Sequence, residues 1–391
     1  MRGLRFLVGG AAAAVAAAAL LLGGVFAESQ AHPVAVTQLD REASAFAQRA
    51  RETGDATYYV KAEGVYRRVL RNEPRDLAAT IGLGALAASR HDFRAALALG
   101  RRAVRLSPTT AAGYGVVGDA LVELGRYEKA FETFNKMVAL KPSVSSYARV
   151  SYARELLGDV RGAAQAMQLA VDSAVGEPEA LAWSHTQLGK LYWNHGRLAA
   201  ATREYRAALA VRPNYASALD ALGQAEAARG HLQAAVALAR HAADVLPLPS
   251  YVGNLGDLLR RSGDGRGAAR QYELVAAIAG LQRAGGINVD LELALFDVDH
   301  RVRLDRAVAR ARAARTARPS IDGDDVLAWA LARNGRCDEA LRYSKHALRL
   351  GTLDAPKFFH RAVIERCLGH RGAAQRWFMR ARTTNPYWRQ P

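Results

Sequence analysis

The sequence predicts an all-α protein built as a stack of repeated helix hairpins. Ala and Arg dominate its 391 residues, whereas the strand-favouring Val, Ile, Phe and Trp are sparse. Proline recurs at a fixed step, because Pro74, Pro108 and Pro142 are each 34 residues apart. The step continues, exactly or nearly, at Pro178, Pro213, Pro247, Pro319 and Pro386, the last two after about two steps each. Such a period indicates a repeat array rather than separate globular domains.

The first 31 residues have the pattern of an export signal. Arg2 and Arg5 precede an uncharged apolar stretch from Phe6 to Phe26, and small residues follow where a signal peptidase cleaves. The stretch also approaches the roughly 20 residues that span a bilayer. We expect residues 1–31 to be a cleaved signal peptide or a retained anchor, with a buried helix as the third alternative. Either export reading predicts an extracytoplasmic protein, secreted or associated with the membrane through residues 4–27.

The fifth copy of the repeat is the clearest. Its markers are Leu188-Gly189, Tyr192, Gly196, Ala201, Tyr205, Ala208 and Pro213. The small Gly189 would let the second helix of the hairpin approach the first, Gly196 would allow the tight turn, and Pro213 would end the second helix. One hairpin cannot bury its own apolar faces, so neighbouring copies must stack.

These markers resemble the tetratricopeptide-repeat (TPR) family, whose pattern is Leu-Gly-x-x-Tyr on a first helix, then Ala-x-x-x-Phe, Ala and Pro on a second. The resemblance implies a right-handed superhelical solenoid of about ten stacked TPR helix hairpins between roughly residues 43 and 386. We expect repeats 1–7 in residues 32–280 and repeats 8–10 in residues 288–391. Residues 281–287, which contain Ala284-Gly285-Gly286, break the spacing and are expected to form an interrupting loop.

The resemblance also implies that a partner binds the concave side, which the first helix of each repeat lines. The register of repeats 5, 6 and 7 places twelve candidate partner-binding residues there: Trp183, Thr186, Gln187, Lys190, Trp193, Asn194, Asp220, Gln224, Asn254, Asp257, Arg260 and Arg261. The two Trp side chains are either an exposed hot spot or packed against neighbouring helices. The polar positions are either a binding groove or simply solvated.

The most basic stretch runs from Arg301 to Arg318, within a chain of formal net charge +17. It contains Arg301, Arg303, Arg306, Arg310, Arg312, Arg315 and Arg318. This stretch could dock an anionic envelope polymer or lipid headgroups. The alternative is the solvated face of one helix whose Ala307, Ala311 and Ala314 point to the core. No nucleic acid partner is expected, because the excess charge is scattered over many segments.

Cys337 and Cys367 fall in adjacent repeats at the same edge of the stack, so the sequence allows either a disulfide or two separate buried thiols. No phosphate loop, dinucleotide fingerprint, nucleophile elbow or Cys-x-x-Cys pair is present. We therefore predict no catalytic residue, no metal and no cofactor. The expected function is a non-enzymatic scaffold that binds an unidentified protein or peptide; the alternative is an accessory protein that binds an anionic polymer or lipid surface.

Overall fold

The computed structural model describes residues 38–390, and every regular element in that range is an α-helix. The helices pair into ten hairpins, as the repeat count predicts. Repeats 1 to 5 are α2 (Gln38–Thr53) with α3 (Thr57–Asn72), α4 (Leu77–Ser89) with α5 (Phe93–Leu106), α6 (Ala111–Glu123) with α7 (Tyr127–Leu140), α8 (Val144–Leu156) with α9 (Val160–Asp172), and α10 (Pro178–Asn194) with α11 (Leu198–Val211).

Repeats 6 to 10 follow the same plan. They are α12 (Ala216–Ala228) with α13 (Leu232–Val245), α14 (Pro249–Arg261) with α15 (Gly265–Ala284), α16 (Asp290–Asp299) with α17 (Leu304–Ala317), α18 (Ile321–Arg333) with α19 (Cys337–Ala347), and α20 (Ala355–Cys367) with α21 (Arg371–Thr384). The predicted all-helical solenoid is confirmed. The predicted signal or anchor lies outside the described residues, and no described helix is long and apolar enough to cross a bilayer.

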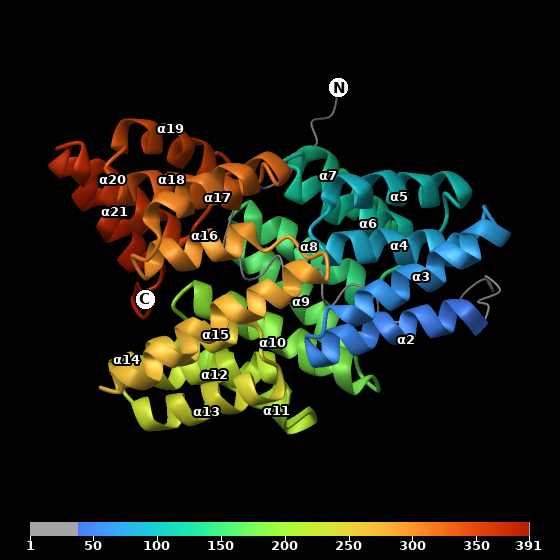
Figure 1. The fold of residues 1–391 in the computed structure, drawn as a ribbon, viewed down its shortest axis with the longest axis horizontal. Helices are drawn as coiled ribbons and strands as arrows, with labels where there is room; N and C mark the ends of the chain where they lie inside the picture. Colours follow the sequence, from blue (N-terminus) through green and yellow to red (C-terminus); the bar gives the residue numbers. More distant parts are fainter. Residues whose placement is uncertain (1–37, 391) are drawn as a thin grey trace.

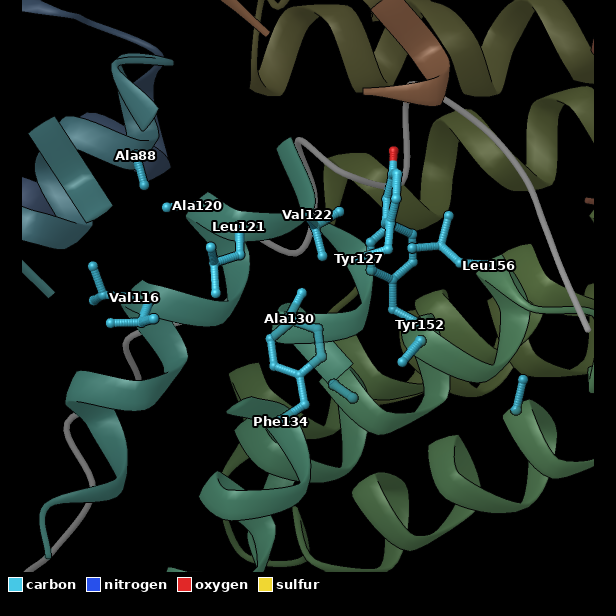
Figure 2. Packing of buried hydrophobic residues seen from close by; sticks show 14 of the residues in the cluster. Ala88, Val116, Ala120, Leu121, Val122, Tyr127, Ala130, Phe134, Tyr152 and Leu156 are labelled. Atoms are coloured by element: carbon cyan, nitrogen blue, oxygen red, sulfur yellow. The ribbon is translucent and has the colours of Figure 1, made fainter. Parts of the chain in front are cut away.

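The repeat markers have the packing roles that the sequence assigns to them. A Cβ on Gly118 would collide with the ring of Phe134, and a Cβ on Gly189 would collide with the ring of Tyr205. The glycine in the first helix therefore makes room for the aromatic residue of the second. Figure 2 shows the resulting core, in which Phe134 and Ala130 of α7 lie under Leu121 of α6.

The predicted loop 281–287 is wrong in part. Residues 281–284 complete α15, which runs for 20 residues, whereas the second helices of most other repeats have 14. Leu281, Gln282, Arg283 and Ala284 are all good helix formers, so the helix continues until Gly285 and Gly286. The break between α15 and α16 is therefore only Gly285 to Val289.

The superhelix closes on itself, so that hairpins five places apart in the chain touch. In repeat 2, His91 Nδ1 lies 2.6 Å from the carbonyl oxygen of Asn288, which follows repeat 7. In repeat 3, the hydroxyl of Tyr127 accepts a hydrogen bond at 2.7 Å from the backbone N–H of Ile321, at the junction of repeats 8 and 9. In repeat 5, the carbonyl oxygen of Trp193 accepts from Asn385 Nδ2, after repeat 10, at 2.7 Å.

The turn of Gly125 shows how tightly these coils approach. Gly125 has φ +69°, a left-handed conformation that favours glycine, and a Cβ there would collide with the carbonyl oxygen of Pro319. The turn of repeat 1 is also covered, because Gly54 faces Leu246 and Leu248 after repeat 6. In Figure 1 the end of α17, in orange, lies next to α7, where Pro319 meets the turn of Gly125. The interior of the superhelix is therefore narrow, and much of it is filled by the chain's own side chains.

Candidate functional site

The inner positions of α10 are more buried than the sequence suggests. Trp183 is 5% exposed and belongs to the largest apolar cluster, together with Leu156 and Met167 of the preceding repeat. Thr186 is fully buried, and its hydroxyl donates to the carbonyl oxygen of Ala182 at 2.7 Å. The exposed-indole interpretation is therefore wrong for Trp183, because that side chain fills the space between repeats 4 and 5. Trp193 is half-buried, against the cluster that contains Tyr205.

Asp220 of α12 is hydrogen-bonded to two other polar residues among the predicted partner-binding residues. Its carboxylate accepts from Asn254 Nδ2 at 3.0 Å and from Gln224 Nε2 at 2.9 Å. Asp220 and Gln224 lie on α12, and Asn254 lies on α14, the first helix of the next repeat. The structure therefore places these three predicted residues in contact with one another. Burial raises the pKa of Asp220 to about 6, although the hydrogen bonds from Asn254 and the charge of Lys190 act to lower it.

Lys190 lies next to this group without forming an ion pair. Its Nζ donates to Ser217 Oγ at 2.9 Å, and it has no carboxylate within ion-pair distance in the described chain. Burial lowers the pKa of Lys190, and the charge of Asp220 opposes that shift. An ammonium group can donate three hydrogen bonds, so two donor positions of Lys190 stay unused by the side chains of residues 38–390.

A small cavity opens beside Lys190, between α8, α9 and α10. Its volume is about 20 Å³, which is enough for one water-sized group. The lining residues are Ala148, Ser151, Tyr152, Glu155, Met167, Gln187, Lys190, Leu191 and Asn194. Three of them, Gln187, Lys190 and Asn194, are predicted site residues.

Glu155 is the residue of this cavity that the sequence analysis missed. It accepts a hydrogen bond from Asn194 Nδ2 at 3.0 Å and is 7% exposed. Burial raises the pKa of Glu155 to about 8, so the group is largely a neutral acid at pH 7 and can donate a hydrogen bond. The only signal in the sequence was an acidic residue on the first helix of repeat 4, a repeat with weak markers.

The predicted partner-binding residues on α14 are more accessible than those on α10. Arg260 and Arg261 are exposed, and Arg261 donates to the carbonyl oxygen of Ala227 at 3.3 Å. Asp257 is half-buried and accepts from the hydroxyl of Tyr272 at 2.7 Å, while its Oδ1 lies 2.9 Å from Nε2 of His300. The candidate site thus runs from a closed, desolvated end at α10 to an open end at α14.

The arginines of α17 are mostly engaged within the protein. Arg303 and Arg310 both pair with the fully buried Asp297, each at 2.5 Å. Arg315 pairs with Asp324 at 2.8 Å, and Arg312 pairs with Glu339. The helix buries Ala307, Ala311 and Ala314. The basic stretch is therefore neither a free anion site nor a simply solvated face, because most of its charge is compensated by carboxylates of this chain.

Arg318 forms the most buried of these ion pairs. Its guanidinium pairs with Glu123 of α6 and with Glu292 of α16, the latter at 2.9 Å. Only 4% of the Arg318 side chain and 3% of the Glu123 side chain are exposed. This group joins repeat 3 to repeat 8 across the coil.

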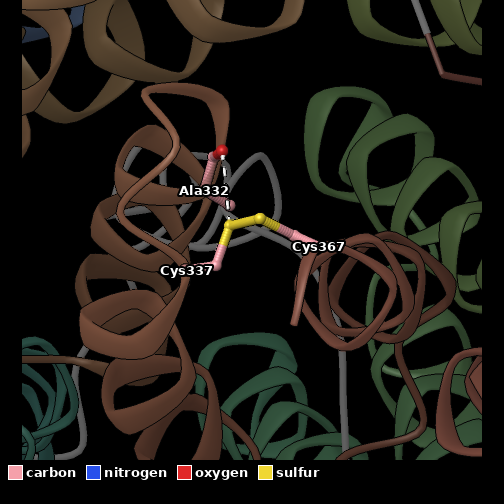
Figure 3. The surroundings of a disulfide bond; sticks show 3 residues. All are labelled: Ala332, Cys337 and Cys367. Carbon is pink, nitrogen blue, oxygen red and sulfur yellow. Dashed lines mark hydrogen bonds between the residues drawn. A yellow bond between two sulfur atoms is a disulfide. The ribbon is translucent and has the colours of Figure 1, made fainter. Parts of the chain in front are cut away.

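Cys337 and Cys367 are joined by a disulfide in the structure, with their Cα atoms 6.2 Å apart. Figure 3 shows the bond linking the start of α19 to the end of α20. It ties repeat 9 to repeat 10. Across residues 38–390, no group of three His, Cys, Asp or Glu side chains is arranged to hold a metal ion.

Ten stacked hairpins of this geometry define an α-helical solenoid, the architecture that protein-interaction scaffolds use. The sequence matches a tetratricopeptide-repeat family model over residues 46–111, 89–145 and 186–247. Residues 46–145 and 186–247 therefore carry tetratricopeptide repeats, a motif whose members in general bind proteins or peptides.

Several solved structures are similar to parts of the chain. The crystal structure of MamA is 21% identical, with 41% of this chain and 93% of that chain covered and a TM-score of 0.33. YrrB, a TPR protein with an unusual peptide-binding site, is 22% identical over 46% of this chain and 92% of its own, with a TM-score of 0.31. PilF of Pseudomonas aeruginosa is 18% identical over 51% and 90%, with a TM-score of 0.42. No curated protein matches the sequence.

Proposed function

We propose that the protein is a non-enzymatic scaffold outside the cytoplasm that binds a protein or peptide segment on the inner surface of repeats 5–7. The observation that carries the proposal is the pair of Lys190 and Gln187 at the cavity. Lys190 keeps unused donors, and the Gln187 amide makes no side-chain hydrogen bond within the described chain. Unused donors in a partly desolvated cavity favour a partner that supplies a hydrogen-bond acceptor.

The extracytoplasmic location is part of the same proposal. The apolar stretch from Phe6 to Phe26 supports it, as does the disulfide between Cys337 and Cys367, since disulfides persist in oxidising compartments. Alkylation of intact cells with a thiol reagent, before and after reduction, tests this point. If Cys337 and Cys367 react with the reagent in growing cells without prior reduction, the two residues are not joined by a disulfide there, and the result would contradict the proposed location.

The binding site is tested by site-specific photocrosslinking in the native host. A photoreactive residue replaces the exposed Arg260 at the open end, with Arg203 on the exposed face of α11 as the control position. We expect a defined adduct from position 260 and none from position 203. The adduct should weaken at least tenfold when Lys190→Met and Gln187→Ala are added, because each removed donor contributes about 1 kcal/mol of binding.

Equal adducts from both positions, or an adduct that the double variant leaves unchanged, would contradict binding on the inner surface. Trp183→Ala is not a suitable probe, because its buried indole would leave a cavity that destabilises the fold. Thermal unfolding of each variant separates loss of the partner from loss of structure.

A further inference from the structure

The C-terminal end of the array, which comprises α21, the end of α20 and the residues after α21 and is called the α21 face, has an unusual charge. Between Glu365 and residue 391 the sequence contains no Asp or Glu, but it contains six arginines. They are Arg366, Arg371, Arg376, Arg380, Arg382 and Arg389. All six are exposed, and none forms an ion pair with a carboxylate in the described structure.

The aromatic residues of this region orient some of the arginines without neutralising them. The guanidinium of Arg380 lies 4.3 Å from the ring centroid of Phe358, and that of Arg366 lies 5.6 Å from that of Phe378. A cation above an aromatic face keeps its full charge. These side chains therefore stand on the surface as fixed, uncompensated cations.

The same region, on α21 and just after it, exposes large apolar side chains. Met379 is 52% exposed and Tyr387 is 37% exposed. Because residues three and four apart are neighbours on a helix surface, Met379 lies between the rows that hold Arg376 and Arg382. The α21 face is thus a basic surface with an apolar side chain at its centre.

We propose that the α21 face docks the protein on an anionic phospholipid bilayer. The charge is complementary to anionic headgroups, and an exposed Met or Tyr among arginines can enter the boundary between headgroups and acyl chains. A single exposed helix is convex, so it fits a flat membrane better than an extended acidic peptide, which needs a groove or a sheet edge. This surface is independent of the inner surface of repeats 5–7.

Vesicle sedimentation tests the proposal with the full chain. Vesicles of phosphatidylcholine alone are compared with vesicles of equimolar phosphatidylcholine and phosphatidylglycerol, which separates anionic docking from any insertion by the apolar N-terminal stretch. We expect tighter binding to the anionic vesicles. Arg376→Gln with Arg382→Gln should weaken that binding by about 25-fold, because each basic residue near an anionic surface contributes about fivefold.

The matched control is Arg266→Gln with Arg270→Gln on α15, since both arginines are exposed and without an ion pair. This control removes the same charge and should bind anionic vesicles within about twofold of the wild type. Met379→Gln should weaken binding several-fold without changing its salt dependence. The Met379 result separates a bilayer from a purely electrostatic partner.

Three outcomes would overturn the proposal. One is equal binding to neutral and anionic vesicles. Another is an equal loss of binding in the α21 and α15 variants, which would indicate an effect of net charge alone. The third is that the protein binds poly-glutamate through Arg376 and Arg382 but does not bind anionic vesicles. That result would assign the α21 face to an acidic protein. The proposed inner-surface site is unaffected by all three.

Discussion

Helices α17 and α21 are both rich in arginine, yet they differ in what their charges do. The stretch that contains α17 has seven arginines, five of which pair with carboxylates of the same chain. Of the six arginines at and around α21, none has such a partner in the described structure. The first set holds repeats together, and the second set is available to something outside the protein.

The difference shows that arginine content alone does not locate an interaction surface. The partners of α17 come from α6, α16, α18 and α19, and one of them, Glu123, is 195 residues away from Arg318 in sequence. The closure of the superhelix brings Glu123 to Arg318, whereas the other carboxylates lie on the same hairpin as α17 or on the next one. A formal net charge of +17 says how many cations are in excess, not which ones are exposed.

The largest expected effect comes from breaking the buried ion pair between Arg318 and Glu123. We expect Arg318→Met to destabilise the fold by about 3–5 kcal/mol, because Glu123 would remain buried without its counter-charge. Urea unfolding followed by circular dichroism measures the change. The control is Arg306→Met on the same helix, an exposed arginine without an ion pair, for which we expect a change within about 0.5 kcal/mol. A similar small effect for both variants would show that the buried pair contributes no more than a surface charge.

A second prediction concerns a buried carboxyl group without an arginine partner. Burial raises the pKa of Glu155 to about 8, from an ordinary value of 4.5. The folded state therefore binds more protons than the unfolded state, and this group's contribution to stability is lost as the pH rises from about 4.5 through about 8.

Glu155→Gln should remove that pH dependence and make the variant more stable than the wild type above pH 8. Unfolding by urea at a series of pH values checks the result, with Glu128→Gln, at an exposed position of α7, as the control. Parallel pH profiles for the wild type and Glu155→Gln would show that Glu155 is ionised in the fold.

The smallest effect is expected on α21. Because Arg376 and Arg382 are exposed and have no carboxylate partner, replacing both by Gln should change the free energy of unfolding by less than about 0.5 kcal/mol. Differential scanning calorimetry at low salt is sufficient for this comparison. A loss of more than about 1 kcal/mol would mean that these arginines stabilise the fold, as those of α17 do.

Most of the fold could be predicted from the sequence, because its determinants are local. The spacing from Pro74 to Pro142 and markers such as Gly189 and Tyr205 gave the hairpins and their number. The predicted loop begins at residue 281, several residues before the glycine pair that ends α15. In the structure, helix-forming residues extend α15 up to that pair.

The candidate site was harder to predict, because its burial depends on how one repeat packs against the next. The register correctly places Asp220, Gln224 and Asn254 next to one another. It could not show that Trp183 is part of the core, nor that Glu155 lies in the cavity. Both facts follow from the packing of repeat 4 against repeat 5, which the markers of a single repeat do not encode.

The touching coils have a mechanical consequence. In an open array each hairpin contacts only its neighbours, so small changes at each interface can lengthen the whole superhelix. Here Asn288 and Pro319 contact the turns of hairpins five places earlier in the chain. Lengthening the molecule would therefore require several of these contacts to break at once. The protein should therefore hold a constant length under tension, as a rigid spacer does, and yield abruptly in one step.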